Sequence, residues 1–409
     1  MVESKKRIID IAFVIIFFFG YKGGLYILNN RLQELGFLLT LILFLYGASK
    51  LAIEKEDINW QWWFWSAPLF VGYFMIVPAV VFYLHTGSSA LFSFFASREF
   101  IIAFLAPTIY FIYKLGYPIE RLETVFICSL VLLLLTYLYF YFTLDLRALL
   151  LQGGYMSMQI TFDEWRGYRL VAPTTALSIL SIYCVLAIFQ RVKWSKRAVI
   201  FIVFCLLCYV WSVRMARSQI AGMILSILLY PLFLSRPNRV NFLMFSSAIS
   251  FFLMTLSMET FLDVFMEEDR IRTNSYRIAF ENIAQNPIFG FGQRSIQGIN
   301  YTDIFGREFY PSDIGLVGLF FKYGFIGGLT YIFYLFYTLV RIVKANWYFK
   351  FIFGRLNAVL WALLIWMIGV VIFAWLKTEF AYLSGIMTAA LIIGLSACYR
   401  DKFKQELSE

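Results

Sequence analysis

Long apolar runs recur along almost the whole chain, and they constrain its fold more than any other feature. Hydrophobic residues make up 61% of the 409 positions, and the mean hydropathy is +0.75. About twelve runs approach or exceed the roughly 17–25 residues that cross a bilayer as a helix. They cover 8–28, 33–53, 62–84, 98–116, 122–143, 170–190, 197–213, 218–235, 240–258, 312–342, 356–376 and 380–398. Because backbone groups in hydrocarbon must be paired within each span, the sequence predicts an all-α polytopic membrane protein with about 12 transmembrane helices.

Neither an internal repeat nor a Pro- or Ser-rich linker divides the chain, which favours a single transmembrane helical domain over 1–409. The first apolar run follows Lys5, Lys6 and Arg7 without a small-residue cleavage site, so we expect a first span rather than a signal peptide. Residues 259–311 form one large loop inserted between the predicted ninth and tenth spans. A loop of this length in a bundle of short connections is where recognition or catalysis is expected.

Basic residues indicate which side of the membrane each connection faces. The net charge is +10, but Lys and Arg fall between apolar runs rather than on one soluble surface, which argues against nucleic acid as a partner. Short basic connections, most clearly RVKWSKR at 191–197, mark the cytoplasmic side, and both termini group with them. The opposite side holds mainly arginine, which binds phosphate or carboxylate through a bidentate fork. The sequence thus predicts anion recognition on the outer side.

Arg214 and Arg217 lie three residues apart in the short connection SVRMARSQ, so they share one face of a helix. One interpretation is a pair of interfacial side chains that reach toward water. The other is an anion site, because an ionisable residue at a span end without an acidic neighbour invites an anionic ligand.

Arg277 lies in a stretch whose apolar residues follow helical spacing, with Asn274 or Ser275 as the predicted N-cap and Pro287 ending the helix. This arginine either forms a solvated pair with Glu281 on an interfacial helix or binds an anion. Both alternatives are open at this point.

Asp313 opens the span that follows the loop, where a carboxylate can serve as a helix N-cap, as a general base, or as both. The single histidine, His85, lies at an outer span end and fits an interfacial hydrogen-bonding residue. No Walker, DxD, HExxH or GxSxG pattern is present, so the sequence predicts an activity that uses no nucleotide, metal or other cofactor.

Taken in order, these features resemble the O-antigen polymerase and ligase superfamily of bacterial surface-polysaccharide assembly. The resemblance rests on three elements: an SR segment at an outer span end (Arg217–Ser218), an arginine followed by NPI-x-G-x-G (Arg277 and 286–292), and a span of the form D-x10-G-x2-G-G-L (Asp313 and 324–329). The similarity in topology extends over the whole chain.

The resemblance implies a metal-independent glycosyltransferase of the GT-C type in the bacterial cytoplasmic (inner) membrane, with residues 259–311 in the periplasm. Its donor would be a glycan on undecaprenyl diphosphate, and its acceptor a sugar hydroxyl of a second lipid-linked repeat unit. A chain-length regulator protein is a further expected partner, besides the lipid bilayer. Arg217 and Arg277 would stabilise the leaving group with support from Arg214, and Asp313 is the candidate base. Other substrate contacts are expected from Arg272, Arg294, Tyr276, Tyr301 and Tyr310.

One departure separates two branches of the family. Ligases of the superfamily place a histidine where Asp313 aligns, and this chain has no histidine after His85. The sequence therefore favours a repeat-unit polymerase over the ligase that transfers glycan to lipid A–core. A flippase for a lipid-linked oligosaccharide is the alternative from another class. Transporters usually show paired half-repeats and broken helices, and we expect neither here.

The predicted orientation can be tested by cysteine labelling. In a cysteine-free variant, single cysteines replacing Gln293 and Lys193 should respond differently to a membrane-impermeant thiol reagent in intact cells. Gln293 belongs to the predicted periplasmic loop and should be labelled, whereas Lys193 belongs to a basic cytoplasmic connection and should react only after lysis. The reverse pattern, read as a mass shift on a gel, would show that the topology is inverted.

Overall fold

The computed structural model describes most of the chain, and the statements below concern the residues that it describes. These are 3–21, 32–54, 62–153, 159–163, 167–188, 190, 194–214, 224, 228, 273–294, 301–306, 309–311, 314–372 and 382–408.

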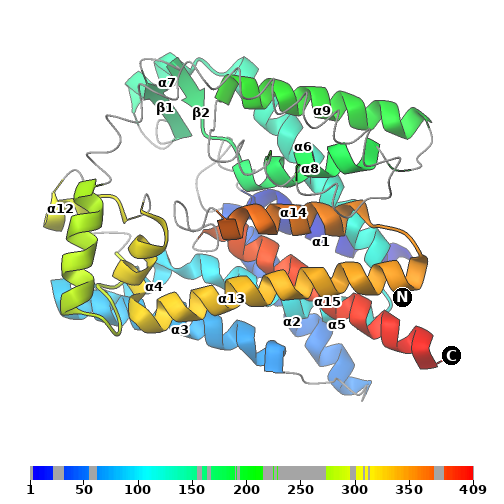
Figure 1. Ribbon diagram of the computed structural model, residues 1–409, viewed down its shortest axis with the longest axis horizontal. Helices are drawn as coiled ribbons and strands as arrows, with labels where there is room; N and C mark the ends of the chain where they lie inside the picture. Colours follow the sequence, from blue (N-terminus) through cyan, green and yellow to red (C-terminus); the bar gives the residue numbers. More distant parts are fainter. Residues whose placement is uncertain are drawn as a thin grey trace.

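Helices account for nearly all of these residues (Figure 1). They are α1 (Glu3–Gly20), α2 (Leu32–Ile53), α3 (Trp62–Thr86), α4 (Ala90–Ala96), the 3-10 helix η1 (Arg98–Phe104), α5 (Leu105–Lys114), α6 (Ile119–Thr143), α7 (Leu146–Gln152), α8 (Thr174–Ile188), α9 (Trp194–Arg214), α12 (Tyr301–Phe305), α13 (Gly315–Phe353), α14 (Ala358–Ile372) and α15 (Leu383–Ser408). A further helix covers 273–285.

A small β-hairpin between α7 and α8 departs from the all-helical expectation. Its strands β1 (Ile160–Asp163) and β2 (Gly167–Leu170) are antiparallel, with Ile160 opposite Leu170 and Asp163 opposite Gly167. Ile160 and Leu170 are buried, so the hairpin packs one end against the bundle.

Five of the described helices are long and apolar enough to cross a membrane: α2, α6, α9, α13 and α15. A sixth span results if α4 and the η1–α5 segment, which meet at a bend of 48°, are taken as one. These helices establish an α-helical membrane protein. Two predicted spans, 218–235 and 240–258, lie outside the described residues except for the helical positions 224 and 228. The total of about twelve therefore stays a prediction.

The termini and the 273–311 region lie at opposite ends of the long axis (Figure 1). Ion pairs join elements at the end that holds the termini: Arg121 Nη2 lies 2.6 Å from Asp10 Oδ2, and Lys114 Nζ lies 2.9 Å from Asp401 Oδ2.

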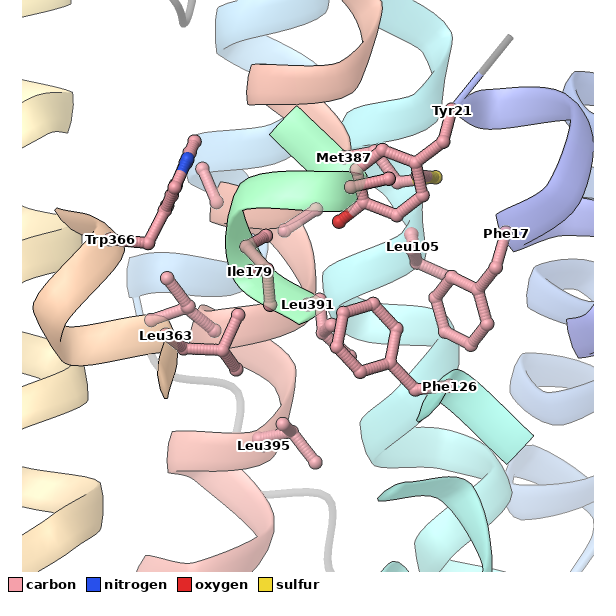
Figure 2. Close-up of a cluster of buried hydrophobic side chains, with 14 of the residues drawn as sticks. Phe17, Tyr21, Leu105, Phe126, Ile179, Leu363, Trp366, Met387, Leu391 and Leu395 are labelled. Atoms are coloured by element: carbon pink, nitrogen blue, oxygen red, sulfur yellow. The ribbon is translucent and has the colours of Figure 1, made fainter. Parts of the chain in front are cut away.

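α15 runs through the centre of the bundle, and 89% of the residues in its most apolar stretch are buried. Small residues on it allow close helix contacts: a Cβ at Gly394 would lie 2.9 Å from Cβ of Ile109 on α5. The hydroxyl groups of Tyr21 and Thr388 form a 2.7 Å hydrogen bond that ties the end of α1 to α15. Figure 2 shows side chains of α15 packed against those of other segments. The labelled residues of α15 are Met387, Leu391 and Leu395, and those of the other segments are Phe17, Tyr21, Leu105, Phe126, Ile179, Leu363 and Trp366.

One buried polar cluster fixes the start of α14 against α6 and α15. Asn357 Oδ1 accepts hydrogen bonds from the backbone N–H groups of Val359 (2.8 Å) and Leu360 (3.2 Å), so it caps α14. Its Nδ2 group donates to both carboxylate oxygens of Glu123 at 2.9 and 2.8 Å. The Tyr399 hydroxyl donates to the same carboxylate at 2.7 Å. The carboxylate of Glu123 on α6 is thereby bonded to the start of α14 and to α15.

The Glu123→Ala variant should be less stable than the wild type by ~1–3 kcal/mol, because Asn357 and Tyr399 would keep buried donors without an acceptor. Glu120→Ala is the matched control. Glu120 lies on the same helix as Glu123, but its ion pair with Lys402 (2.9 Å) is at the surface. We expect at most ~1 kcal/mol from that change. Unfolding midpoints in detergent measure both, and equal losses would contradict the assignment of a structural lock to Glu123.

Candidate functional site

The described residues between 273 and 311 pack on the ends of α3 and α13, at the end of the molecule away from the termini (Figure 1). The described part comprises the helix at 273–285, a turn at 286–294 and α12. This region has an apolar core of its own, separate from the core of the bundle. Its buried members are Phe82, Ile278, Ala279, Phe291, Tyr301, Phe309, Ile314 and Phe321.

α13 is broken at Gly324, whose φ of 65° and ψ of −170° are not helical. In an unbroken helix, the N–H groups of Phe325 and Ile326 would donate to the carbonyls of Phe321 and Lys322. The break leaves all four of these groups without their intrahelical partners. Inside a membrane bundle such groups need other partners, because each unpaired one costs several kcal/mol.

The turn at 286–294 supplies partners to all four groups. Phe291 N donates to Phe321 O at 2.7 Å, and Gly292 N donates to Lys322 O at 3.0 Å. In the other direction, Phe325 N donates to Pro287 O at 2.8 Å, and Ile326 N donates to Ile288 O at 3.3 Å. The NPIFGFG stretch and the KYGFIGG stretch are therefore two halves of one backbone interlock.

Glycine is needed where the two halves touch. A Cβ at Gly290, whose φ is 72°, would lie 2.5 Å from both Gly324 N and Phe321 O. A Cβ at Gly324 would lie 2.2 Å from Ile288 O. Such contacts are with backbone atoms, which cannot move aside as a flexible side chain could. Gln293 N continues the docking by donating to Pro78 O on α3 at 3.1 Å.

The buried side chain of Tyr301 holds the turn in place through two hydrogen bonds. Its hydroxyl donates to Gly292 O at 2.5 Å and accepts from Arg294 N at 3.1 Å. Burial raises the pKa of the Tyr301 hydroxyl, which keeps it protonated as a donor. The expectation that Tyr301 holds a sugar ring is wrong, because its side chain is buried in the core of this region.

The aromatic residues around the turn form a stack that includes the only histidine. The His85 ring lies parallel to Phe291 at a centroid distance of 4.8 Å, and Phe291 stacks on Phe321 at 5.5 Å. His85 is exposed on its other side. His85 therefore lies at the surface of α3, next to the turn.

Arg277, Arg294, Tyr276 and Tyr310 are in the described part of the region. Arg277 is exposed; its Nη2 donates to Asn274 Oδ1 at 3.1 Å, and its Nη1 lies 3.9 Å from Glu281 Oε1. Tyr276 is half-buried. Arg294 and Tyr310 are exposed. Tyr310 N donates to Ser275 Oγ at 3.2 Å, which places Tyr310 against the helix that carries Tyr276 and Arg277.

The other predicted site residues are not placed. Arg217, Arg272 and Asp313 lie outside the described residues, and Arg214 is described only as the last residue of α9. The N-cap position of α13 belongs to Ile314, the residue after Asp313.

Two local expectations from the sequence are wrong. Asn274 and Ser275 do not cap the helix, because it already includes residue 273, and Ser275 instead binds the backbone of Tyr310. The expectation that broken helices are absent is also wrong: α13 is broken at Gly324, and α4 meets η1–α5 at a bend of 48°.

Lys322 was missed by the sequence reasoning. It precedes the break by two positions, and its Nζ lies 6.0 Å from the centroid of the Tyr301 ring. The signal was present in the sequence, because a lysine inside an apolar run is expensive and usually has a specific partner.

An apolar groove of about 440 Å³ lies between α6 and α9. Its lining comes from Leu138, Phe142, Phe201, Ile202, Cys205, Leu206 and Tyr209. The groove thus reaches Tyr209, in the part of α9 that leads to its last residue, Arg214.

Compared with known proteins, the chain matches no protein-family model and no curated protein.

Gly290→Ala should open the interlock, because the added Cβ meets the backbone of α13. Gly306→Ala is the matched control: Gly306 also has a positive φ (97°), but nothing lies within 4 Å of its Cβ position. The control should lose only the ~1–2 kcal/mol of left-handed backbone strain. Hydrogen exchange followed by mass spectrometry should show faster exchange in 287–292 and 321–326 for Gly290→Ala alone. Unchanged protection in Gly290→Ala would refute the interlock.

Proposed function

We propose that this chain is a polymerase of surface-polysaccharide repeat units, related to the O-antigen polymerase and ligase superfamily. It would have about twelve spans and the GT-C architecture, in the bacterial inner membrane. Both termini would face the cytoplasm and residues 259–311 the periplasm. The donor would be a glycan on undecaprenyl diphosphate, and the acceptor a hydroxyl of another lipid-linked unit.

The observation that carries this proposal is the interlock between the two motif stretches. The resemblance depends on NPI-x-G-x-G and on the glycines that follow Asp313, which are separated by more than thirty positions in the sequence. In the structure, these stretches bind each other through four backbone hydrogen bonds. Stretches that are distant in sequence and joined in this way form one structural unit, and that unit carries the helix of Arg277 at the end of the bundle.

The groove between α6 and α9 supports a lipid-linked donor. A polyprenyl diphosphate has an apolar tail and an anionic head, so its site needs an apolar channel that ends at cations. The groove is lined by apolar and aromatic side chains, and α9 ends in Arg214. Arg217 follows three positions later in the sequence. The tail would lie along α9 and the diphosphate at these two arginines.

In the proposed reaction, the acceptor hydroxyl oxygen attacks the anomeric carbon of the donor sugar. The new glycosidic C–O bond forms as the C–O bond to the diphosphate breaks, and undecaprenyl diphosphate leaves with the electron pair. Arg217 and Arg277 would stabilise the negative charge that develops on the diphosphate, supported by Arg214. Arg272 and Arg294 would bind the remaining anionic groups, and the rings of half-buried Tyr276 and exposed Tyr310 would face the sugars.

The acceptor proton needs a base, and Asp313 is the proposed one. In the sequence it directly precedes Ile314, the N-cap of α13, and a helix N-terminus is the positive end of the helix dipole. This end favours the ionised carboxylate, which can accept a proton. Glu281 and the exposed His85 are the next candidates in the same region.

A flippase for a lipid-linked oligosaccharide is the second candidate, and the helix breaks favour it. Broken helices at a binding site are common in transporters, and α13 and the α4–α5 segment both contain one. At Gly324, however, the broken backbone is paired with the loop. A ligase acting on lipid A–core would share the fold, and the missing histidine argues against it.

A deletion strain complemented with variants tests the function and the arginines together. Loss of the gene should leave single capped repeat units on a polysaccharide gel, if the protein is a polymerase. Unlinked polymer with bare core would indicate a ligase, and absence of surface glycan would indicate a flippase.

Arg217→Lys and Arg277→Lys should each lower polymer formation by roughly 30-fold or more, because lysine keeps the charge but lacks the bidentate fork. Arg355→Lys, an exposed position between α13 and α14, is the matched control and should give normal polymer. Normal polymer from both site variants at normal protein abundance would exclude phosphate contacts by these arginines.

A further inference from the structure

Arg341 is a buried cation on α13, near the end of the molecule that is opposite the 273–311 region. It lies roughly 25 Å along the helix from Gly324, at 1.5 Å per residue. Its exposed fraction is only 8%. A basic side chain at the end of a span normally extends so that its charged group reaches water. Arg341 does not, because it is enclosed within the bundle.

The guanidinium of Arg341 rests on an aromatic ring with one face, and one of its edges is buried without a hydrogen-bond acceptor among the described residues. Its Cζ lies 5.7 Å from the centroid of the Tyr337 ring, so one face rests on an aromatic surface. Its Nε and Nη2 atoms are buried and have no hydrogen-bond acceptor among the described residues. These two atoms are adjacent and point the same way, which makes them a fork for an anion with two oxygens. Leaving charged donors buried and unpaired is strongly unfavourable.

A neighbouring positive charge makes the unpaired guanidinium of Arg341 still less favourable. Arg400, on α15, lies within electrostatic reach of Arg341 and repels it. The nearby carboxylate of Asp401 is already engaged by Lys114 Nζ at 2.9 Å, by the Tyr110 hydroxyl at 2.7 Å, and by Arg400 Nη2 at 3.5 Å. The described carboxylate beside Arg400 is thus shared with other donors, and Arg400 adds to the positive charge that Arg341 experiences.

We propose that the Nε–Nη2 fork of Arg341 binds the phosphate of an anionic lipid headgroup or a free phosphate ion. Phosphate matches a fork geometry and carries the negative charge that the unpaired edge of Arg341 needs. Basic pockets between transmembrane helices are known places for anionic headgroups.

The surface next to Arg341 has the chemistry of a membrane interface. Trp347 and Phe351 are exposed on α13, and each of their rings packs against Phe403 of α15, with centroid distances of 5.1 and 4.9 Å. Aromatic belts of this kind lie at the level of the lipid headgroups. Lys344 is exposed one turn after Arg341 and adds positive charge there. A headgroup phosphate at this level would bind if it entered between the helices as far as the buried fork.

This site is independent of the proposed glycan chemistry. It lies at the other end of α13 and uses no residue with a proposed role in catalysis or substrate binding.

The test uses the full chain in nanodiscs of phosphatidylcholine, with or without phosphatidylglycerol, and in phosphatidylcholine with inorganic phosphate added. Native mass spectrometry measures retained lipid, and the thermal midpoint measures stabilisation. We expect wild-type protein to retain phosphatidylglycerol and to gain stability from it. Arg341→Gln and Arg341→Lys should retain it about 30-fold or more weakly, because neither offers the fork. Lys344→Gln, which removes a neighbouring exposed charge, should stay within about threefold of wild type.

Each outcome decides between the sources or against the site. Stabilisation by inorganic phosphate alone, lost in Arg341→Gln, would identify a soluble phosphate as the ligand. Equal retention and equal midpoints for wild type and Arg341→Gln in both arms would overturn the proposal, as would a normal affinity in Arg341→Lys. If the variants do not fold, wild-type protein that shows no preference for phosphatidylglycerol and no response to phosphate overturns it equally.

Discussion

Pairing of backbone groups in an apolar surrounding governs the end of this protein that lies away from the termini. At Gly324 the helical backbone is interrupted, and the turn at 286–294 forms four backbone hydrogen bonds with residues on both sides of the break. Hydrogen-bonding groups that water cannot reach must find partners in the chain itself. The direction of α13, the place of the 273–285 helix and the positions of Arg277 and Arg294 all follow from this one junction.

Hydropathy predicted the locations of helices well and their directions poorly. The runs 33–53, 122–143 and 197–213 correspond closely to α2, α6 and α9. The run 98–116 corresponds to the contiguous η1 and α5, but the 48° bend at which this segment meets α4 was not predicted. Composition indicates that a segment is apolar, but a bend depends on what packs against it. The β1–β2 hairpin was missed for a similar reason, since four-residue strands leave almost no pattern.

Glycine spacing located the candidate site, whereas the roles of single side chains needed tertiary partners. NPI-x-G-x-G and the glycines from Gly324 were found as separate patterns, and their mutual contact could not be derived from either one. Tyr301 was expected to contact substrate, but its side chain is buried and its hydroxyl donates to Gly292 O. Glu123 and Asn357 drew no attention in the sequence, because their meeting depends on the packing of three helices.

The junction at Gly324 also bears on how this protein can diverge. A side chain at Gly290 collides with α13, and one at Gly324 collides with the turn, so neither position can change while the other stays as it is. The hydrogen bonds fix the number of residues between Pro287 and Gly292 as well, because each donor must meet its carbonyl. We infer that these two stretches are inherited as a pair: descendants keep both or lose both together, while exposed helix faces around them drift freely.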